Sequence, residues 1–271
     1  MDKNPQGSDQ IFTWASGDAY ERYVGRWSRL VAQKFLSWLS LSPGLRWLDI
    51  GCGSGALCQA IIQFASPGEV MGIDSSEGYV AFTRQKIRDD RARFLVGDAQ
   101  ALTVETDSYN AVVSGLVLNF IPQPVLAVKE MARVVKPGGV VAAYVWDYAG
   151  DMQMIRYFWN AASALDPAAY ELGEGRRFPI CKPEALADLF QNAGLREVEG
   201  IPLVIDTVFK DFDDYWLPFL GGQGPAAGYA MSLSEEKRTA LRERLRDGLP
   251  FALDGSIPLV ARAWAVRGYS I

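Results

Sequence analysis

The sequence predicts an α/β fold in which a mostly parallel β-sheet has helices on both faces. Apolar segments of strand length alternate with segments of helical periodicity between residues 47 and 146. Such alternation is typical of parallel strands joined by crossover helices. The first apolar segment also runs directly into a glycine-rich turn, the arrangement in which α/β proteins bind nucleotide-like ligands at the carboxyl end of a strand.

Composition sets the outer limits of the interpretation. The chain has 271 residues, 49% hydrophobic and 22% charged, which is ordinary for one large globular domain, with or without an insertion. The net charge of -5 gives no overall basic surface for nucleic acid. One local basic group is more simply an exposed helix and its following turn: Arg84, Lys86, Arg88, Arg91 and Arg93.

Several classes of site are excluded by residue content. The chain has 0 histidines, so no Ser-His-Asp or Cys-His catalytic arrangement can form, and we expect no Cys/His zinc site and no bound metal. The three cysteines are an odd number without a paired framework. Residues 1–10 do not read as a secretory signal, and no run approaches the roughly 20 apolar residues of a membrane span. We therefore expect reduced thiols in a cytoplasmic protein without a membrane span.

The N-terminal region is expected to form a helical cap over residues 1–40. Residues 1–18 have the composition of an arm, and residues 18–39 have apolar side chains at near-helical spacing. Gly25 interrupts this pattern, so two shorter helices are an alternative. The apolar face is expected to cover the edge of the sheet.

The first strand and its turn occupy residues 47–55, where the glycine spacing also fits the dinucleotide fingerprint. Asp49 precedes Gly51 by two positions, and the loop contains no Lys or Arg to attract a pyrophosphate. A carboxylate beside the turn suits a cationic ligand such as S-adenosylmethionine, which has an ammonium and a sulfonium. Asp49, Gly51, Cys52 and Gly53 are the first candidate binding residues.

Residues 48–55, Leu-Asp-Ile-Gly-Cys-Gly-Ser-Gly, resemble the first motif of the class I S-adenosylmethionine-dependent methyltransferases. The chain is similar to the small-molecule, type 11 members of that class, such as those of quinone biosynthesis. The resemblance implies a Rossmann-like, seven-stranded sheet ending in an antiparallel hairpin, with S-adenosylmethionine as cofactor and S-adenosylhomocysteine as product. The segment Tyr-x-x-x-x-Gly-Arg-Trp-Ser also resembles the family, which makes Tyr20 and Arg26 candidates for closing over the cofactor.

The second strand, residues 70–74, ends in Asp74, which follows Gly51 by 23 positions. This is close to the spacing of a ribose-binding carboxylate, and Ser75 follows as a further candidate. The alternative is that Asp74 caps the helix that begins near Ser75 or Ser76.

Residues 93–102 contain the third strand and the acidic turn after it, with Asp98 and Ala99 in the turn. In the family that the chain resembles, this acid lies by the adenine amino group and the next backbone N–H meets a ring nitrogen. A carboxylate can accept from an amine, so the assignment is chemically consistent. The alternative is that Asp98 only forms a turn.

The fourth strand, residues 109–116, resembles the family's fourth motif, and we expect backbone groups of Ser114, Gly115 and Leu116 to face the methionine end of the cofactor. The Asn/Asp-Pro-Pro-Tyr signature of DNA and RNA amino-methyltransferases is absent from the chain. A helix ending near Val135, a break at residues 136–139 and a fifth strand at 140–146 complete a cofactor-binding core over residues 41–148.

Two insertions interrupt the regular pattern, at residues 149–181 and 209–252, and are expected to form a lid and substrate region. A helix at 183–193 lies between them, and a charged helix at 234–247 lies inside the second. Residues 203–208 and 257–266 fit the last two strands, as the antiparallel hairpin. The whole chain is expected to be one methyltransferase domain.

Methyl transfer to a hydroxyl or carbon needs a base, and the candidates after the fifth strand are Asp147 and Tyr148. The alternative for Asp147 is that it only begins a turn. Many aromatic side chains lie in the segments expected to form the lid, which favours a small apolar or aromatic acceptor, although core positions are the alternative for each. These side chains are Trp14, Tyr20, Trp146, Tyr148, Tyr157, Phe158, Trp159, Tyr215, Trp216 and Phe219.

Three other functions remain open on the sequence. A NAD-dependent oxidoreductase is disfavoured by Asp49 and Asp98, and a protein or RNA methyltransferase by the acidic charge and the missing signature. A non-catalytic S-adenosylmethionine-binding protein also fits, because methyl transfer need not require a fixed catalytic residue. The expected partner is a small-molecule methyl acceptor rather than nucleic acid.

Overall fold

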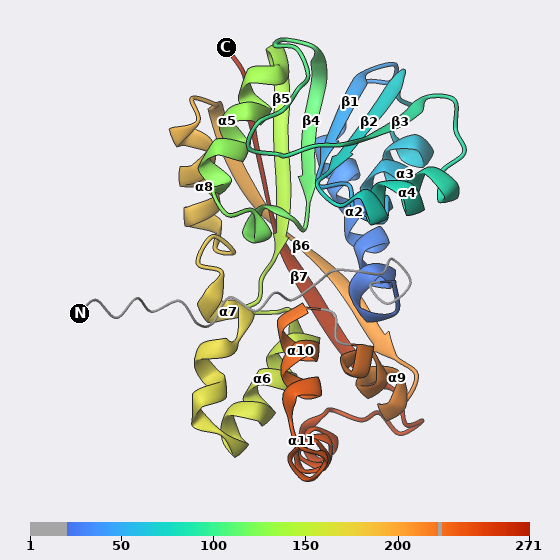
Figure 1. Cartoon of the computed structure of the whole chain (residues 1–271), viewed down its shortest axis with the longest axis vertical. Coiled ribbons are helices and arrows are strands. Elements are labelled where there is room, and N and C mark those ends of the chain that lie inside the picture. The colour runs from blue at the N-terminus through green and yellow to red at the C-terminus, as the bar shows by residue number, and fades with distance from the viewer. Residues whose placement is uncertain (1–20, 222–223) are drawn as a thin grey trace, which may run out of the picture.

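A computed structural model describes residues 21–221 and 224–271 of the chain (Figure 1). The candidate Tyr20, Trp14 and the expected arm at 1–18 lie outside these ranges. The elements in chain order are η1 (Glu21–Gly25), α2 (Arg26–Leu39), β1 (Arg46–Ile50), α3 (Ala56–Phe64), β2 (Glu69–Asp74), α4 (Glu77–Lys86), β3 (Ala92–Val96), β4 (Tyr109–Gly115), η2 (Leu118–Phe120), α5 (Pro124–Val134), β5 (Val135–Trp146), α6 (Gln153–Leu165), η3 (Pro167–Leu172), α7 (Glu174–Arg177), α8 (Pro183–Asn192), β6 (Arg196–Phe209), α9 (Phe212–Trp216), η4 (Leu217–Gly221), α10 (Gly224–Ser232), α11 (Glu235–Gly248) and β7 (Ile257–Tyr269).

The seven strands form one sheet in the order β3-β2-β1-β4-β5-β7-β6. Strands β1 to β5 are parallel, and β7 pairs antiparallel with both β5 and β6. The predicted α/β sheet with a terminal antiparallel hairpin is therefore confirmed. The chain reverses its direction of travel across the sheet between β1 and β4, and ligands of open α/β sheets bind outside the carboxyl ends of the strands at such a point.

Helices cover both faces of the sheet, α2, α3 and α4 on one and α5 and α8 on the other (Figure 1). Successive residues of β5 alternate between the two apolar cores. Val140, Ala142 and Tyr144 belong to the core with α2 and α3, whereas Val141 and Ala143 belong to the core with α5 and α8. This alternation explains why residues 140–146 of the strand are continuously apolar in sequence, since both faces are buried there.

The two expected insertions form a helical region at the end of the sheet where β5 stops. We call this region the cap; it is distinct from the N-terminal helical cap expected over residues 1–40. Figure 1 shows α6, α7, α9, α10 and α11 gathered there, around the far end of the long β6–β7 hairpin. The interior of this cap is aromatic. Phe158 stacks on Phe219 with ring centroids 4.6 Å apart, and Tyr23 meets Phe219 edge-on at 5.5 Å. Within the described residues, no helix combines the length and the apolar character that crossing a membrane would need.

The structure corrects several boundaries. β6 begins at Arg196 rather than at residue 203, and its first half is largely exposed, so that half lacks the alternating apolar signal. The predicted break at residues 136–139 is wrong, because β5 already begins at Val135, directly after α5, with a register shift opposite Tyr109 and Ala111. Gly138 has φ +73°, a conformation that suits glycine, and it lies in the irregular stretch between the pairs Tyr109–Val135 and Ala111–Val140.

Candidate functional site

The turn after β1 is shaped by backbone hydrogen bonds to the neighbouring strand. The amides of Gly51 and Cys52 both donate to the carbonyl of Ile73, at 2.7 and 3.0 Å. Gly51 has φ +71°, and a Cβ there would lie 2.4 Å from the side chain of Val117. At Gly53, by contrast, a Cβ would have only the carbonyl oxygen of Gly51 within 4 Å, at 3.9 Å. Gly51 is therefore required by packing, whereas the space beside Gly53 is open for a ligand.

Asp49 lies at the base of this turn and is only 1% exposed. Its Oδ2 accepts a hydrogen bond from the Cys58 thiol at 3.1 Å, and its Oδ1 has no partner among the described residues. Burial raises the pKa of Asp49 to about 7; the Cys58 hydrogen bond opposes this rise and the nearby Asp74 adds to it. An isolated buried carboxylate is costly, so a cationic ligand beside it would be stabilised.

Asp74 connects the first turn to the second. Its Oδ2 accepts from the Gly53 amide at 2.9 Å, and its Oδ1 accepts from the Ser76 amide at 2.9 Å. The alternative that Asp74 caps the next helix is wrong. The N-cap of α4 is Ser76, whose hydroxyl accepts from the Tyr79 amide at 3.3 Å. The Asp74 carboxylate is thus held at the carboxyl end of β2, facing the glycine turn.

Asp98 follows β3 and forms a local turn. Its Oδ1 accepts from the Gln100 amide at 2.8 Å. The Gln100 backbone N–H and then its side-chain amide lower the pKa of Asp98. Asp98 also lines the same pocket as Asp49 and Asp74, together with Ala99. The turn-forming role and a place at the pocket are therefore compatible in one side chain.

The exit of β4 provides the opposite side of the site. Gly115 and Leu116 line the pocket, but Ser114 is fully buried and its hydroxyl donates to the Ile50 carbonyl at 2.9 Å. The side chain of Ser114 therefore links β4 to β1, and Ser114 is not among the described residues that line the pocket. Leu116 has φ +63°, an uncommon conformation for a non-glycine residue, and its amide donates to the Tyr144 carbonyl at 2.8 Å.

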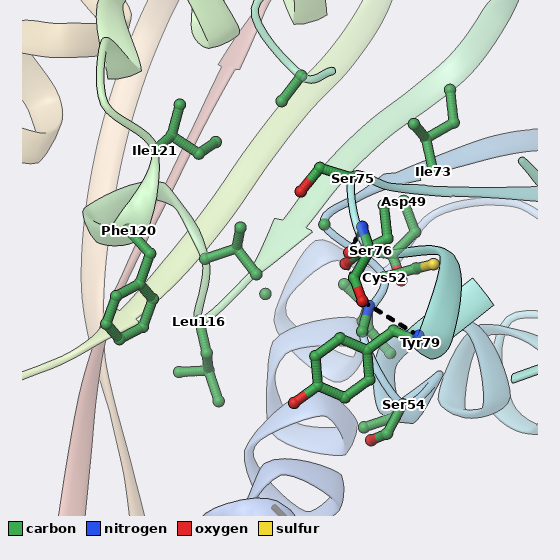
Figure 2. A pocket seen from close by; sticks show the side chains of 18 of the residues that line it. Asp49, Cys52, Ser54, Ile73, Ser75, Ser76, Tyr79, Leu116, Phe120 and Ile121 are labelled. Carbon is green, nitrogen blue, oxygen red and sulfur yellow. Dashed lines mark hydrogen bonds between the residues drawn. The ribbon is translucent and has the colours of Figure 1, made fainter. Parts of the chain in front are cut away.

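These strand ends surround one pocket of about 510 Å³, which is within the range of small-molecule sites. Figure 2 shows Leu116, Phe120 and Ile121 on one side of it and Asp49, Cys52, Ser75, Ser76 and Tyr79 on the other. We call the polar side the cofactor half; it is lined by Asp49, Gly51, Cys52, Gly53, Ser54, Asp74, Ser75, Ser76, Tyr79, Gly97, Asp98, Ala99, Gln100 and Gly115. We call the mostly apolar and aromatic part of the lining the acceptor half. Its residues come from η1, from the exit of β4, and from β5 and the turn after it: Val24, Leu116, Val117, Phe120, Ile121, Pro122, Tyr144, Trp146 and Tyr148.

Two further candidate residues, Arg26 and Asp147, do not line this pocket. The Arg26 guanidinium pairs with Asp214 at 2.8 Å and lies over the rings of Trp27 and Phe209, so it joins α2 to the cap. Asp147 is 4% exposed and is held by Arg262 and by the amides of Gly150 and Asp151. This geometry supports the alternative that Asp147 forms a turn and counts against it as a base. Tyr148, in contrast, lines the acceptor half.

The aromatic side chains of the expected lid are mostly core. Phe158, Trp159, Tyr215, Trp216 and Phe219 are buried in the cap, and only Trp146 and Tyr148 of the described set line the pocket. Sequence reasoning missed other lining residues. Tyr79 lies in the first turn of α4 and Phe120 in the short helix after β4, so both follow the carboxyl end of a strand. That position is the signal that could have identified them.

Comparisons with known proteins agree with the fold. A methyltransferase domain family model matches residues 48–143, from the first motif to the middle of β5. A demethylmenaquinone methyltransferase of Staphylococcus aureus (strain JH9) is 29% identical over 172 residues, which are 59% of this chain and 71% of that protein.

Solved structures share the fold. The YcgJ protein of Bacillus subtilis has a TM-score of 0.58 at 18% identity, with 89% of this chain and 98% of that chain covered. Phosphoethanolamine N-methyltransferase 2 of Haemonchus contortus, solved with S-adenosyl-L-methionine, has a TM-score of 0.58 at 17% identity, covering 93% of this chain and 56% of that chain. The matched domain and the curated relative support a class I S-adenosylmethionine-dependent methyltransferase of the type 11 kind, and the solved structures show that the fold is shared.

Proposed function

We propose that the pocket binds S-adenosylmethionine in its cofactor half and that the chain transfers the methyl group to a small, uncharged, largely apolar or aromatic acceptor. The observation that carries the proposal is the carboxylate of Asp49. It is buried at the base of the glycine turn with one oxygen unpartnered among the described residues. A cationic ligand would pair with that carboxylate, whereas a pyrophosphate would be repelled by it.

The other polar residues of the cofactor half fit the rest of the cofactor. The open space beside Gly53 allows close approach of a ligand to the backbone, and Asp74 provides carboxylate oxygens for ribose hydroxyls. Asp98 and the Ala99 amide are proposed at the adenine. The backbone of Gly115 and Leu116 is proposed at the methionine end, and Cys52 and Ser75 complete the lining.

The acceptor half supports an uncharged molecule. None of its described lining residues is Asp, Glu, Lys or Arg, and three of them are Tyr144, Trp146 and Tyr148 from the end of β5. Apolar and aromatic walls stabilise apolar ligands by burying their surface. The relative named as a demethylmenaquinone methyltransferase supports a small-molecule acceptor. The net charge of -5 supports the same conclusion over nucleic acid.

When bound, S-adenosylmethionine supplies an electrophilic methyl group on its sulfonium. The protein residues position the two ligands in line and exclude water from the pocket. Tyr148 is the proposed base if the acceptor is a hydroxyl or carbon, because it lines the acceptor half at the end of β5. The three free, buried cysteines support a reducing compartment, so we propose that the protein acts in the cytoplasm.

Calorimetric titration of the purified protein with S-adenosylmethionine, S-adenosylhomocysteine and NAD tests the cofactor directly. We expect the first two to bind and NAD not to bind. Mass spectrometry would then detect methylation in a panel of phenols and hydroquinones of similar size. Binding of NAD alone would contradict the assignment. Binding of both sulfur ligands without methylation of any acceptor would favour a non-catalytic binding protein.

A further inference from the structure

The helical cap contains a buried carboxylate that the proposed chemistry does not use. Glu174, the first residue of α7, is only 2% exposed. Its Oε2 accepts a hydrogen bond from the Trp159 indole of α6, and its Oε1 accepts from the Ala226 amide of α10 at 3.4 Å. One carboxyl group therefore joins three helices of the cap.

Helix α7 in turn lies directly against the turn that follows β5. A Cβ on Gly175 would lie 3.0 Å from the Ala149 Cα and 3.1 Å from the Tyr148 carbonyl oxygen, so the two backbones are in close contact. This approach is tighter than side chains ordinarily allow, and glycine makes it feasible. The position of α7 therefore determines the position of the segment that contains Tyr148.

The residue after α7 extends this contact to a second wall residue. The ring of Phe178 lies 5.1 Å from that of Phe120, edge to face, and 5.9 Å from that of Tyr148. Phe120 and Tyr148 both line the acceptor half. Aromatic pairs at these separations are stabilising, so a shift of α7 would disturb both walls.

We propose that Glu174 is a positioning residue for the acceptor half: by joining α7 to α6 and α10, it keeps Phe178 against Phe120 and Tyr148. The proposal rests on the function proposed above for this pocket. It assigns Glu174 no contact with the cofactor half, whose described lining residues come from the ends of β1 to β4 and the turns and helices that follow them.

The pH dependence of cap opening distinguishes a role of the Glu174 carboxyl group from simple packing. Burial raises the pKa of Glu174 from 4.5 to about 7, while its own backbone amide, the Trp159 and Ala226 hydrogen bonds and Arg177 act in the opposite direction. The other titratable groups that interact with it are Tyr23 of η1 and Cys181, the pKa of each of which is raised partly by Glu174.

Proton linkage makes the opening of the cap depend on pH. A cap that opens returns Glu174 to an ordinary carboxyl environment, so the closed cap holds the proton more tightly than the open one. Closure is therefore weakened as pH rises towards 7 and changes little above it. With pKa values of about 7 when closed and 4.5 when open, the open fraction increases about tenfold between pH 6 and pH 8.

Hydrogen–deuterium exchange of the full chain, read by mass spectrometry on peptides covering residues 147–151 and 173–180, measures this opening. Rates are corrected with the unfolded chain at each pH. We expect the wild type to lose about tenfold protection between pH 6 and pH 8. Glu174→Gln should show no such change. Glu171→Gln is the matched control, because Glu171 is exposed on η3, and it should behave as the wild type.

Cofactor affinity and pH-dependent protection test the two proposals separately. Calorimetry should give Glu174→Gln an affinity for S-adenosylmethionine within twofold of the wild type. Wild-type protection that is equal at both pH values would overturn the positioning role, and so would a Glu174→Gln variant that retains the pH dependence. If Glu174→Gln does not fold, Trp159→Phe removes one of the two hydrogen bonds and should lower protection of both peptides at both pH values; unchanged protection would overturn the role. A wild type that binds no S-adenosylmethionine would refute only the proposed function.

Discussion

Arg262 holds Asp147 across the junction between the sheet and the cap. The Arg262 Nη2 and Nε lie 2.6 and 2.7 Å from Asp147 Oδ2, and Nη1 lies 3.1 Å from Asp151 Oδ2. The backbones are joined as well, because the Asp147 amide donates to the Arg262 carbonyl at 2.9 Å. The first insertion therefore begins from a fixed point on β7.

Arg262→Gln should lower the free energy of unfolding by about 2–3 kcal/mol, since it leaves a buried carboxylate without its cation. The value lies below that of a fully buried pair because the Arg262 side chain is 28% exposed. Urea denaturation measures the loss. Arg176→Gln removes an exposed pair with Glu171 and should cost less than about 1 kcal/mol. Equal losses in the two variants would contradict the structural role of Asp147.

Gly53→Val should abolish detectable binding of S-adenosylmethionine while leaving most of the fold intact. The new side chain would project into space that only the Gly51 carbonyl borders, and that space is where the cofactor is proposed to approach the backbone. Gly138→Val is the control, because Gly138 also has positive φ and open surroundings but lies on β5 far from the turn in sequence. It should cost stability through backbone strain and leave calorimetric affinity unchanged. Normal binding by a folded Gly53→Val protein would contradict the proposal that the cofactor approaches the backbone at Gly53.

Asp74→Ala should weaken binding of S-adenosylmethionine by about 1.5–3 kcal/mol, the scale of hydrogen bonds to charged groups. Part of the loss would arise because Asp74 also holds the Gly53 and Ser76 amides. Asp206→Ala, on the exposed face of β6, removes the same charge far from the pocket and should have no effect. Titration calorimetry on both variants decides the matter, and unchanged affinity for Asp74→Ala would contradict the ribose assignment.

Binding of the cationic cofactor should depend on pH through Asp49. The ligand-free carboxyl has a pKa of about 7, raised mainly by burial, and a cation beside it would lower that pKa. Binding then releases a proton below pH 7, so affinity should rise about eightfold between pH 6 and pH 7.5 and level off above. Asp49→Asn should bind the cofactor more weakly, and its affinity should depend less on pH. Comparing the two proteins also corrects for titration of the ligand's own amine, which is the same in both. The same slope in both proteins would exclude Asp49 as the linked group.

The position of the cofactor half could be predicted because it depends on local order along the chain. Asp49, Asp74 and Asp98 each lie at or just after the carboxyl end of a strand, and parallel strands bring those ends to one edge of the sheet. Hydrophobic runs and glycine turns in the sequence indicate directly where each strand ends. The side chain of Ser114 was not predictable in the same way, since the direction of one side chain at a strand end depends on its neighbours.

The aromatic residues that line the acceptor half could not be singled out from the sequence. Aromatic residues of the two insertions and of the segment before them read alike in sequence. Phe158 and Phe219 stack on each other inside the cap, whereas Trp146 and Tyr148 line the pocket. Arg26 likewise turns from the pocket to Asp214, a partner 188 positions away. Pairings over such separations leave no periodic pattern in the chain.

The sequence by itself determined the α/β sheet, the glycine turn and the three acidic residues around it, because strand periodicity and turn chemistry are local properties of the chain. Only the tertiary structure decided that Asp147 belongs to Arg262, that most of the cap's aromatic side chains are core, and that Glu174 is buried between three helices. The physical reason is that burial, and with it the pKa of a carboxyl group, depends on which distant segments pack against it.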